Sequence, residues 1–175
     1  MPPAPPEQTQ TYAGASNDGS RSLMGWLGWG ACLIASPLAR IALAVPFLRS
    51  GLTKWSGFLT LSPAAQFLFE EQFKLHIFGH TYGFPAPDVI AWIDSVAEIV
   101  LPCLLILGLA TRLSALGLLI MTAVIQLTVP EGWANFHLPW AALAVAIIAL
   151  GPGRASLDFW IGRAWAPRQA TGRSS

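Results

Sequence analysis

DSVAEIVLPCLLILGLATR, residues 94–112, decides the fold, because it places two carboxylates at the head of a run that stays apolar until Arg112. Asp94 and Glu98 are one helical turn apart, so a helix presents both on one face. Ionisable groups inside a membrane segment are costly and are by default candidates for a functional site. The alternative is a structural ion pair that only holds two helices together.

The composition indicates an integral membrane protein. Of 175 residues, 54% are hydrophobic and 11% are charged, whereas a soluble domain carries about 25% charged residues. A net charge of +1, with no block of like charges, argues against a nucleic-acid partner. Cys32 and Cys103 lie far apart and form no CxxC motif, so we expect buried, unreactive thiols and no disulfide framework or zinc site.

Apolar runs of spanning length predict an all-α integral membrane four-helix bundle. The four-span domain is expected over residues 37–162, followed by a disordered tail over residues 163–175. The predicted spans are residues 37–58, 88–110, 113–129 and 133–150.

The N-terminal part of the chain is expected to lie outside the bundle. Residues 1–21 are Pro-rich and then polar, which predicts a disordered tail. Residues 22–36 are mainly apolar but too short to span, which predicts an interfacial or re-entrant segment. Ser36-Pro37 is then expected to begin the first span as N-cap and first-turn proline.

A long connection joins the first two spans. Ser62-Pro63 predicts the start of an amphipathic helix over residues 64–78, AAQFLFEEQFKLHIF, lying on the membrane surface. Connections of this length are uncommon unless they act as lids or binding elements.

Basic residues predict the orientation of the chain. Arg112 and most other arginines fall on one side of the four spans, whereas Lys74 is the clearest basic residue in the opposite loops. The positive-inside rule therefore places both termini in the cytoplasm. Arg40 is expected to extend its side chain to that surface.

At about 1.5 Å of rise per residue, polar side chains of all four spans reach one layer, about 21 to 25 Å above the cytoplasmic arginines. Lys54, Glu98, Gln126 and His137 share this layer, and Arg49 and Asp94 lie about one turn away. Trp140 follows His137 by three residues and is either an aromatic wall for a ligand or an interfacial anchor.

Such a set can hydrogen-bond a carbonyl and exchange a proton, which are the needs of quinone reduction or quinol oxidation. Glu98 and His137 are the catalytic candidates. The predicted binding residues are Arg49, Lys54, Asp94, Gln126 and Trp140.

The sequence has no CxxCH motif and no cysteine cluster to carry electrons, so redox chemistry would require a partner subunit. We predict no metal site, because Gly79 would interrupt a helix bearing His76 and His80.

Three stretches resemble the DoxX family of small four-helix membrane proteins. They are LARIALAVPFLRSGLTKW in the first span, AEIVLPCLLILGLATRLSALGLLIMT across the second and third, and HLPWAALAVAIIALGPGRASLD at the end. Within them, the most family-like features are Gly51 to Lys54, Ala97-Glu98, Gly108 to Arg112, His137 and the Gly-Pro-Gly-Arg-x-Ser-Leu-Asp ending.

The resemblance implies a multi-pass protein of the bacterial inner membrane that is associated with quinone-linked redox complexes, including those that handle sulfur, thiol or oxidative stress. Its partners would be the lipid bilayer and a redox subunit or a soluble periplasmic or cytoplasmic protein. The chain has no reactive cysteine pair, so the sulfur chemistry itself is not carried over. A membrane anchor, an assembly factor, a small-solute transporter and a homo-oligomer stay open as alternatives.

Overall fold

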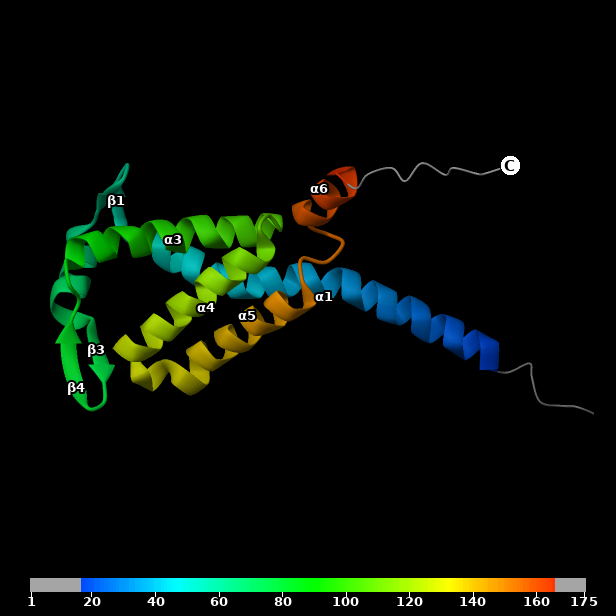
Figure 1. Ribbon diagram of the computed structural model, residues 1–175, viewed down its shortest axis with the longest axis horizontal. Coiled ribbons are helices and arrows are strands. Elements are labelled where there is room, and N and C mark those ends of the chain that lie inside the picture. The colour runs from blue at the N-terminus through cyan, green and yellow to red at the C-terminus, as the bar shows by residue number, and fades with distance from the viewer. Residues whose placement is uncertain (1–16, 166–175) are drawn as a thin grey trace, which may run out of the picture. The chain divides into compact units, whose positions relative to one another are not determined.

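The computed structural model describes the backbone of residues 17–165 and the side chains of residues 33–165 (Figure 1). Residues 1–32 and 33–175 form two separate compact units, and the account below concerns the second. Four helical segments there are long and apolar enough to cross a membrane, which confirms the predicted all-α membrane bundle. They are Leu33–Thr53, Pro87–Leu107, Thr111–Thr128 and Pro130–Leu150.

Helices α1 (Asn17–Thr53), α3 (Pro87–Leu107), α4 (Thr111–Thr128) and α5 (Leu138–Leu150) supply these segments. A 3₁₀ turn, η2 (Pro130–Gly132), and a π turn, η3 (Trp133–His137), precede α5 and complete its span. Apolar side chains from all four helices meet in one core, whose largest members are Leu43, Phe47, Leu105, Leu118 and Ile147. Many other large apolar side chains face outward, as expected where lipid replaces water.

Two predictions about α1 are wrong. The helix continues through Pro37, so Ser36 does not cap it, and the Ser36 hydroxyl instead donates to the Pro152 carbonyl at 3.1 Å. The helix also ends at Thr53 and not near residue 58, because the following residues form a strand. Cys103, expected to be buried, is exposed on α3, and the side chain of Cys32 lies outside the described residues.

The connection between α1 and α3 folds as a unit, which we call the loop cap (residues 55–86). It begins with the hairpin β1 (Trp55–Gly57) and β2 (Thr60–Leu61), continues with α2 (Pro63–Phe67) and the π turn η1 (Leu68–Gln72), and ends with the hairpin β3 (Lys74–Ile77) and β4 (His80–Gly83). Ser62 caps α2 as predicted, by accepting from the Ala65 N–H. Leu61 and Phe69 pack on Ala91 of α3, so the loop cap is attached to the bundle.

The predicted amphipathic helix over residues 64–78 is therefore correct only as far as Gln72. Phe78 and Gly79 both have positive φ (49° and 80°), which is the geometry of a two-residue type I′ hairpin turn. Leu75 pairs with Tyr82, and Ile77 pairs with His80. Because His76 is adjacent to Ile77, the two histidines lie on opposite faces of this hairpin.

At the opposite end of the bundle, which we call the turn end, the α3–α4 turn meets the segment after α5. The Asp158 carboxylate accepts the N–H groups of Ala110 and Thr111, each at 2.8 Å, and so caps the N-terminus of α4. The Ser156 hydroxyl accepts from the Phe159 N–H at 3.2 Å and so caps the start of α6 (Leu157–Trp165). The predicted tails fall mainly in residues 1–16 and 166–175, outside the described residues.

Arg40 also lies at the turn end, and the prediction that its side chain reaches the membrane surface is wrong. It is 1% exposed and donates to the Ala155 carbonyl at 2.5 Å. Gly108, with φ +70°, makes room for it, since a Cβ there would come within 2.6 Å of the Ser156 Cβ and would also clash with the guanidinium. The family-like glycine and the Ser-Leu-Asp ending thus build one packed joint around Arg40.

Candidate binding site at the cap end of the bundle

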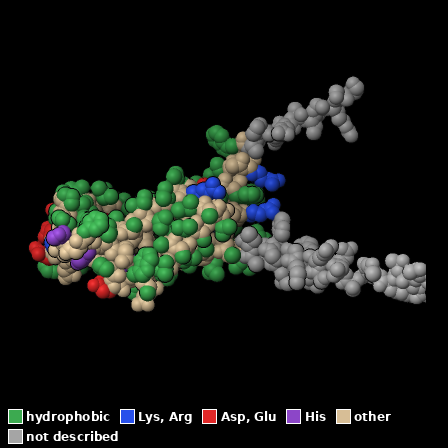
Figure 2. Space-filling view, turned by 60° about the horizontal axis from the view of Figure 1, so that its bottom comes forward, with side chains coloured by type: hydrophobic (Ala, Val, Ile, Leu, Met, Phe, Trp, Pro, Cys, Tyr) green, Lys and Arg blue, Asp and Glu red, His purple; other side chains and the backbone are tan. Residues whose placement is uncertain are grey.

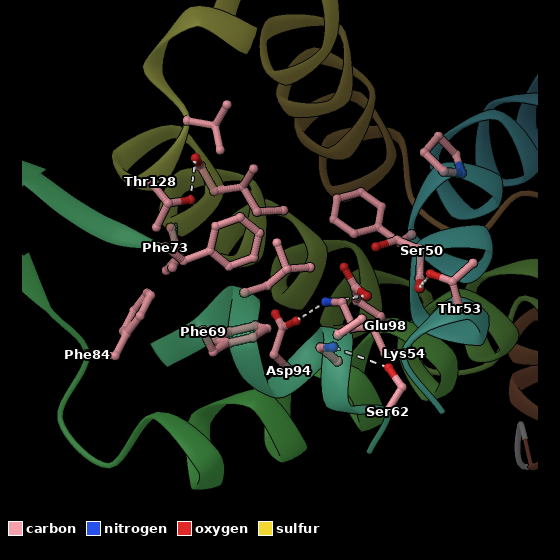
Figure 3. A pocket seen from close by; sticks show the side chains of 18 of the residues that line it. Ser50, Thr53, Lys54, Ser62, Phe69, Phe73, Phe84, Asp94, Glu98 and Thr128 are labelled. Atoms are coloured by element: carbon pink, nitrogen blue, oxygen red, sulfur yellow. Dashed lines mark hydrogen bonds and ion pairs between the residues drawn. The ribbon is translucent and has the colours of Figure 1, made fainter. Parts of the chain in front are cut away.

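The end of the bundle that carries the loop cap, the cap end, holds a buried cluster of three charged side chains. Lys54, the residue after α1, pairs with Asp94 and lies 2.8 Å from the Glu98 carboxylate, both on α3 (Figure 3). Lys54 is 9% exposed and Glu98 3% exposed. Asp94 and Glu98 lie on one face of α3, as the sequence predicted, and this places both carboxylates next to Lys54.

Gly51 sets the distance between the two helices at this point. A Cβ on Gly51 would lie 2.9 Å from the Glu98 Cβ, closer than real Cβ contacts allow. The absence of a side chain therefore lets α1 approach α3 closely enough for Lys54 to reach both carboxylates.

A cavity of about 470 Å³ opens beside the cluster, within the range of small-molecule binding sites. Its lining comes from α1, α3, the end of α4, Trp140 and the loop cap, and is mainly apolar. The aromatic members are Phe47, Phe69, Phe73, Phe84 and Trp140 (Figure 3). The Lys54 ammonium lies 5.2 Å from the centre of the Phe69 ring, a cation–π distance.

The charges at this cavity do not balance. One lysine faces two carboxylates, so with all three ionised the cluster carries one excess negative charge. Such a cluster can take up a proton or hold a positively charged group while Lys54 stays paired. Lys54 can also donate to a carbonyl oxygen of a molecule in the cavity.

Gln126 and His137 form a second pair and do not join the lysine cluster. The two side chains are hydrogen bonded at 2.6 Å between His137 Nδ1 and Gln126 Oε1, and neither lines the cavity. His137 stands in the π turn η3, whereas the depth estimate assumed regular α-helices. The single polar layer predicted from the sequence is therefore two separate clusters.

Trp140 lies between His137 and the cavity. Its ring lies 5.1 Å from that of Phe47 and 5.6 Å from that of His137, and it lines the cavity. His137 thus contacts Trp140 of the cavity wall but does not line the cavity itself.

Arg49 takes no part in either cluster: its side chain is exposed and does not line the cavity. At about 100° per residue, Arg49 points about 140° away from Lys54 around α1, which explains why depth alone misplaced it. Among residues 33–165, no three His, Cys, Asp or Glu side chains are placed to hold a metal ion.

Several lining residues were missed by the sequence analysis. Phe47 and Ser50 precede Lys54 at helical spacing, so the face of α1 that carries Lys54 could have identified them. The positions of the loop-cap residues Phe69, Phe73 and Phe84 depend on how the loop cap folds. No helical spacing in the sequence indicates that these three residues meet.

The DoxX family model matches residues 35–131, more than half of the chain. This protein belongs to the DoxX family. No curated protein and no solved structure matches the chain. The DoxX match includes the lysine cluster and Gln126, whereas His137, Trp140 and Asp158 lie beyond it.

Proposed function

We propose that this DoxX-family membrane protein binds a quinone in the cap-end cavity and acts as the quinone-associated subunit of a membrane redox complex. The supporting observation is a mainly apolar cavity of about 470 Å³ whose wall carries Lys54, Asp94 and Glu98. An aromatic ring with polar oxygens needs this combination of apolar surface and few polar contacts.

Each residue of the cluster has a distinct part in this proposal. Lys54 donates a hydrogen bond to a quinone oxygen. Glu98, the more buried acid, hydrogen-bonds the quinone through the proton that it exchanges during electron transfer. Asp94 holds Lys54 in place. Trp140 and Phe69 pack against the ring. Electrons would pass to or from a partner subunit, since the sequence has no CxxCH motif or cysteine cluster.

A second candidate is a small-solute binding or transport protein without redox function. It is favoured by the excess carboxylate at the cavity. A site that combines aromatic rings with a net negative charge from carboxylates suits a lipophilic organic cation. If neither class of ligand binds, a structural ion pair in a membrane anchor or assembly factor accounts for the cluster.

We place the chain in the bacterial inner membrane with the turn end and both termini in the cytoplasm. Arg112, Arg154 and Arg163 are exposed near the turn end, and Glu70 and Glu71 are exposed on the loop cap. In Figure 2 the histidines and most visible acidic side chains lie at one end, and most visible basic side chains lie toward the other. Reporter fusions after Gln72 and Arg112 test this: an external signal at Arg112 contradicts it.

The functional proposal is tested by purifying the chain in mild detergent and measuring co-extracted and added quinone. Glu98→Gln should abolish binding while the protein stays folded, because Asp94 still pairs with Lys54. Arg49→Gln is the matched control, since it removes a charge from α1 outside the cavity. Tetraphenylphosphonium, a lipophilic cation, is titrated in parallel.

Binding of quinone that is lost in Glu98→Gln and kept in Arg49→Gln supports the proposal. Binding of the cation but not of quinone supports the second candidate. Equal quinone binding in both variants would contradict the assignment of the cavity.

A further inference from the structure

Helix α6 carries an exposed apolar face. Leu157, Trp160, Ile161 and Trp165 are all exposed, up to 62% for Trp160 and 84% for Trp165. Their spacing places them along one side of the helix. Asp158 and Phe159, on the other side, are half-buried.

The position of α6 is fixed by its first turn. The Asp158 carboxylate accepts from Ala110 and Thr111, and the Asp158 N–H donates to the Gly108 carbonyl at 2.9 Å. Helix α6 is therefore anchored to the α3–α4 turn.

The connection from α5 keeps α6 close to the bilayer. Six residues, 151–156, separate the two helices, and a fully extended chain of that length reaches only about 20 Å. An apolar face with two tryptophans at this depth matches the boundary between lipid headgroups and acyl chains.

Basic side chains surround the same helix. Arg112, Arg154 and Arg163 are exposed; the Arg112 guanidinium lies over Gly151, and the Arg154 guanidinium lies 5.8 Å from the Phe159 ring centre. Asp158, the acid on α6, is already occupied by backbone N–H groups. The charge beside the apolar face is thus positive.

We propose that α6 lies in the interfacial layer of the bilayer and binds anionic phospholipids. Its apolar face enters the acyl boundary, and Arg112 and Arg163 contact lipid phosphate groups. This surface lies at the turn end, whereas the proposed ligand cavity lies at the cap end, so either proposal can fail without the other.

The depth of α6 is tested with the full chain carrying Cys32→Ser and Cys103→Ser and a single spin label. The label is placed at Ile161, on the apolar face, or at Gly162, about 100° around the helix and with no neighbour for a Cβ. In vesicles of phosphatidylcholine and phosphatidylglycerol, the label at residue 161 should be accessible to oxygen and shielded from a nickel chelate. The label at residue 162 should show the reverse preference.

Equal nickel accessibility at both positions would overturn the proposal, and so would shielding of residue 161 from both reagents, which would show that a protein partner covers the face. The lipid preference is tested by the immobilised fraction of spin-labelled phosphatidylglycerol on the unlabelled protein. Arg163→Gln should lower this preference about fivefold, with Arg49→Gln as the control. An unchanged preference after Arg163→Gln and Arg112→Gln together would overturn the headgroup assignment.

Discussion

The two ends of the bundle each bury one basic residue, Arg40 in α1 and Lys54 directly after it, but they surround it differently. At the turn end Arg40 contacts backbone, its hydrogen-bond partner is the Ala155 carbonyl, and Gly108 leaves space for nothing else. At the cap end Lys54 faces two carboxylates and borders a cavity. A charge enclosed by backbone can only hold the fold together, whereas a charge beside open space can also meet a ligand.

The largest effect is expected where removal of one charge leaves two others unpaired. Lys54→Met should lower the free energy of unfolding by about 3 to 5 kcal/mol, because Asp94 and Glu98 lose their partner. Adding Asp94→Asn and Glu98→Gln should restore most of this stability. Thermal unfolding in detergent measures both. A triple variant as unstable as Lys54→Met would show that packing of the lysine, and not charge, holds the cap end.

At the turn end, the free energy of unfolding should be sensitive to added side-chain volume and not to charge. Gly108→Ala adds a Cβ at φ +70° against Ser156 and Arg40, and overpacking with left-handed strain should cost about 2 to 4 kcal/mol. Gly162→Ala is the control, because a Cβ at Gly162 meets nothing within 4 Å. The same unfolding assay applies, and equal stability of the two variants would contradict a packed joint.

Asp158→Asn should cost about 1 to 2 kcal/mol through loss of the α4 N-cap. Burial alone would raise the pKa of Asp158, but the N–H groups of Thr111 and Ala110 and the charge of Arg40 outweigh it and lower this pKa below its usual value. A lowered pKa means that the carboxylate stabilises the fold above the unfolded-state pKa of about 3.9.

The stability difference between wild type and Asp158→Asn should therefore be constant near neutral pH. It should shrink as the pH falls below about 4 toward the folded-state pKa. Melting temperatures of both proteins from acid to neutral pH provide the measurement. A difference that grows on acidification would contradict this role.

The smallest effect on ligand binding is expected from His137→Ala. His137 contacts Trp140 but does not line the cavity, so its loss should weaken binding less than Glu98→Gln does. Loss of the Gln126 hydrogen bond should cost about 1 kcal/mol of stability. Trp140→Leu should weaken binding more than His137→Ala, as measured by quinone titration. The opposite order would indicate that His137 contacts the ligand itself.

The sequence predicted the bundle because the length and polarity of a span depend only on neighbouring residues. It also predicted that Asp94 and Glu98 share a face, since one helix determines that. It failed where the position of a residue depends on another element: Arg40 was assigned to the membrane surface, but the segment after α5 encloses it. The fold of residues 74–83 as a hairpin depends on two positive φ values at Phe78-Gly79, and a helical pattern of apolar residues concealed this.

The bond between Arg40 and Ala155 joins residues 115 positions apart, whereas the pair of Lys54 and Asp94 spans only 40. During synthesis the acids of α3 therefore emerge long before the segment that encloses Arg40. The cluster of Lys54, Asp94 and Glu98 can assemble from the first two spans. Arg40 lacks its final hydrogen-bond acceptor until the segment after the last span has left the ribosome. Closure of the turn end is thus the step that marks a completely inserted chain.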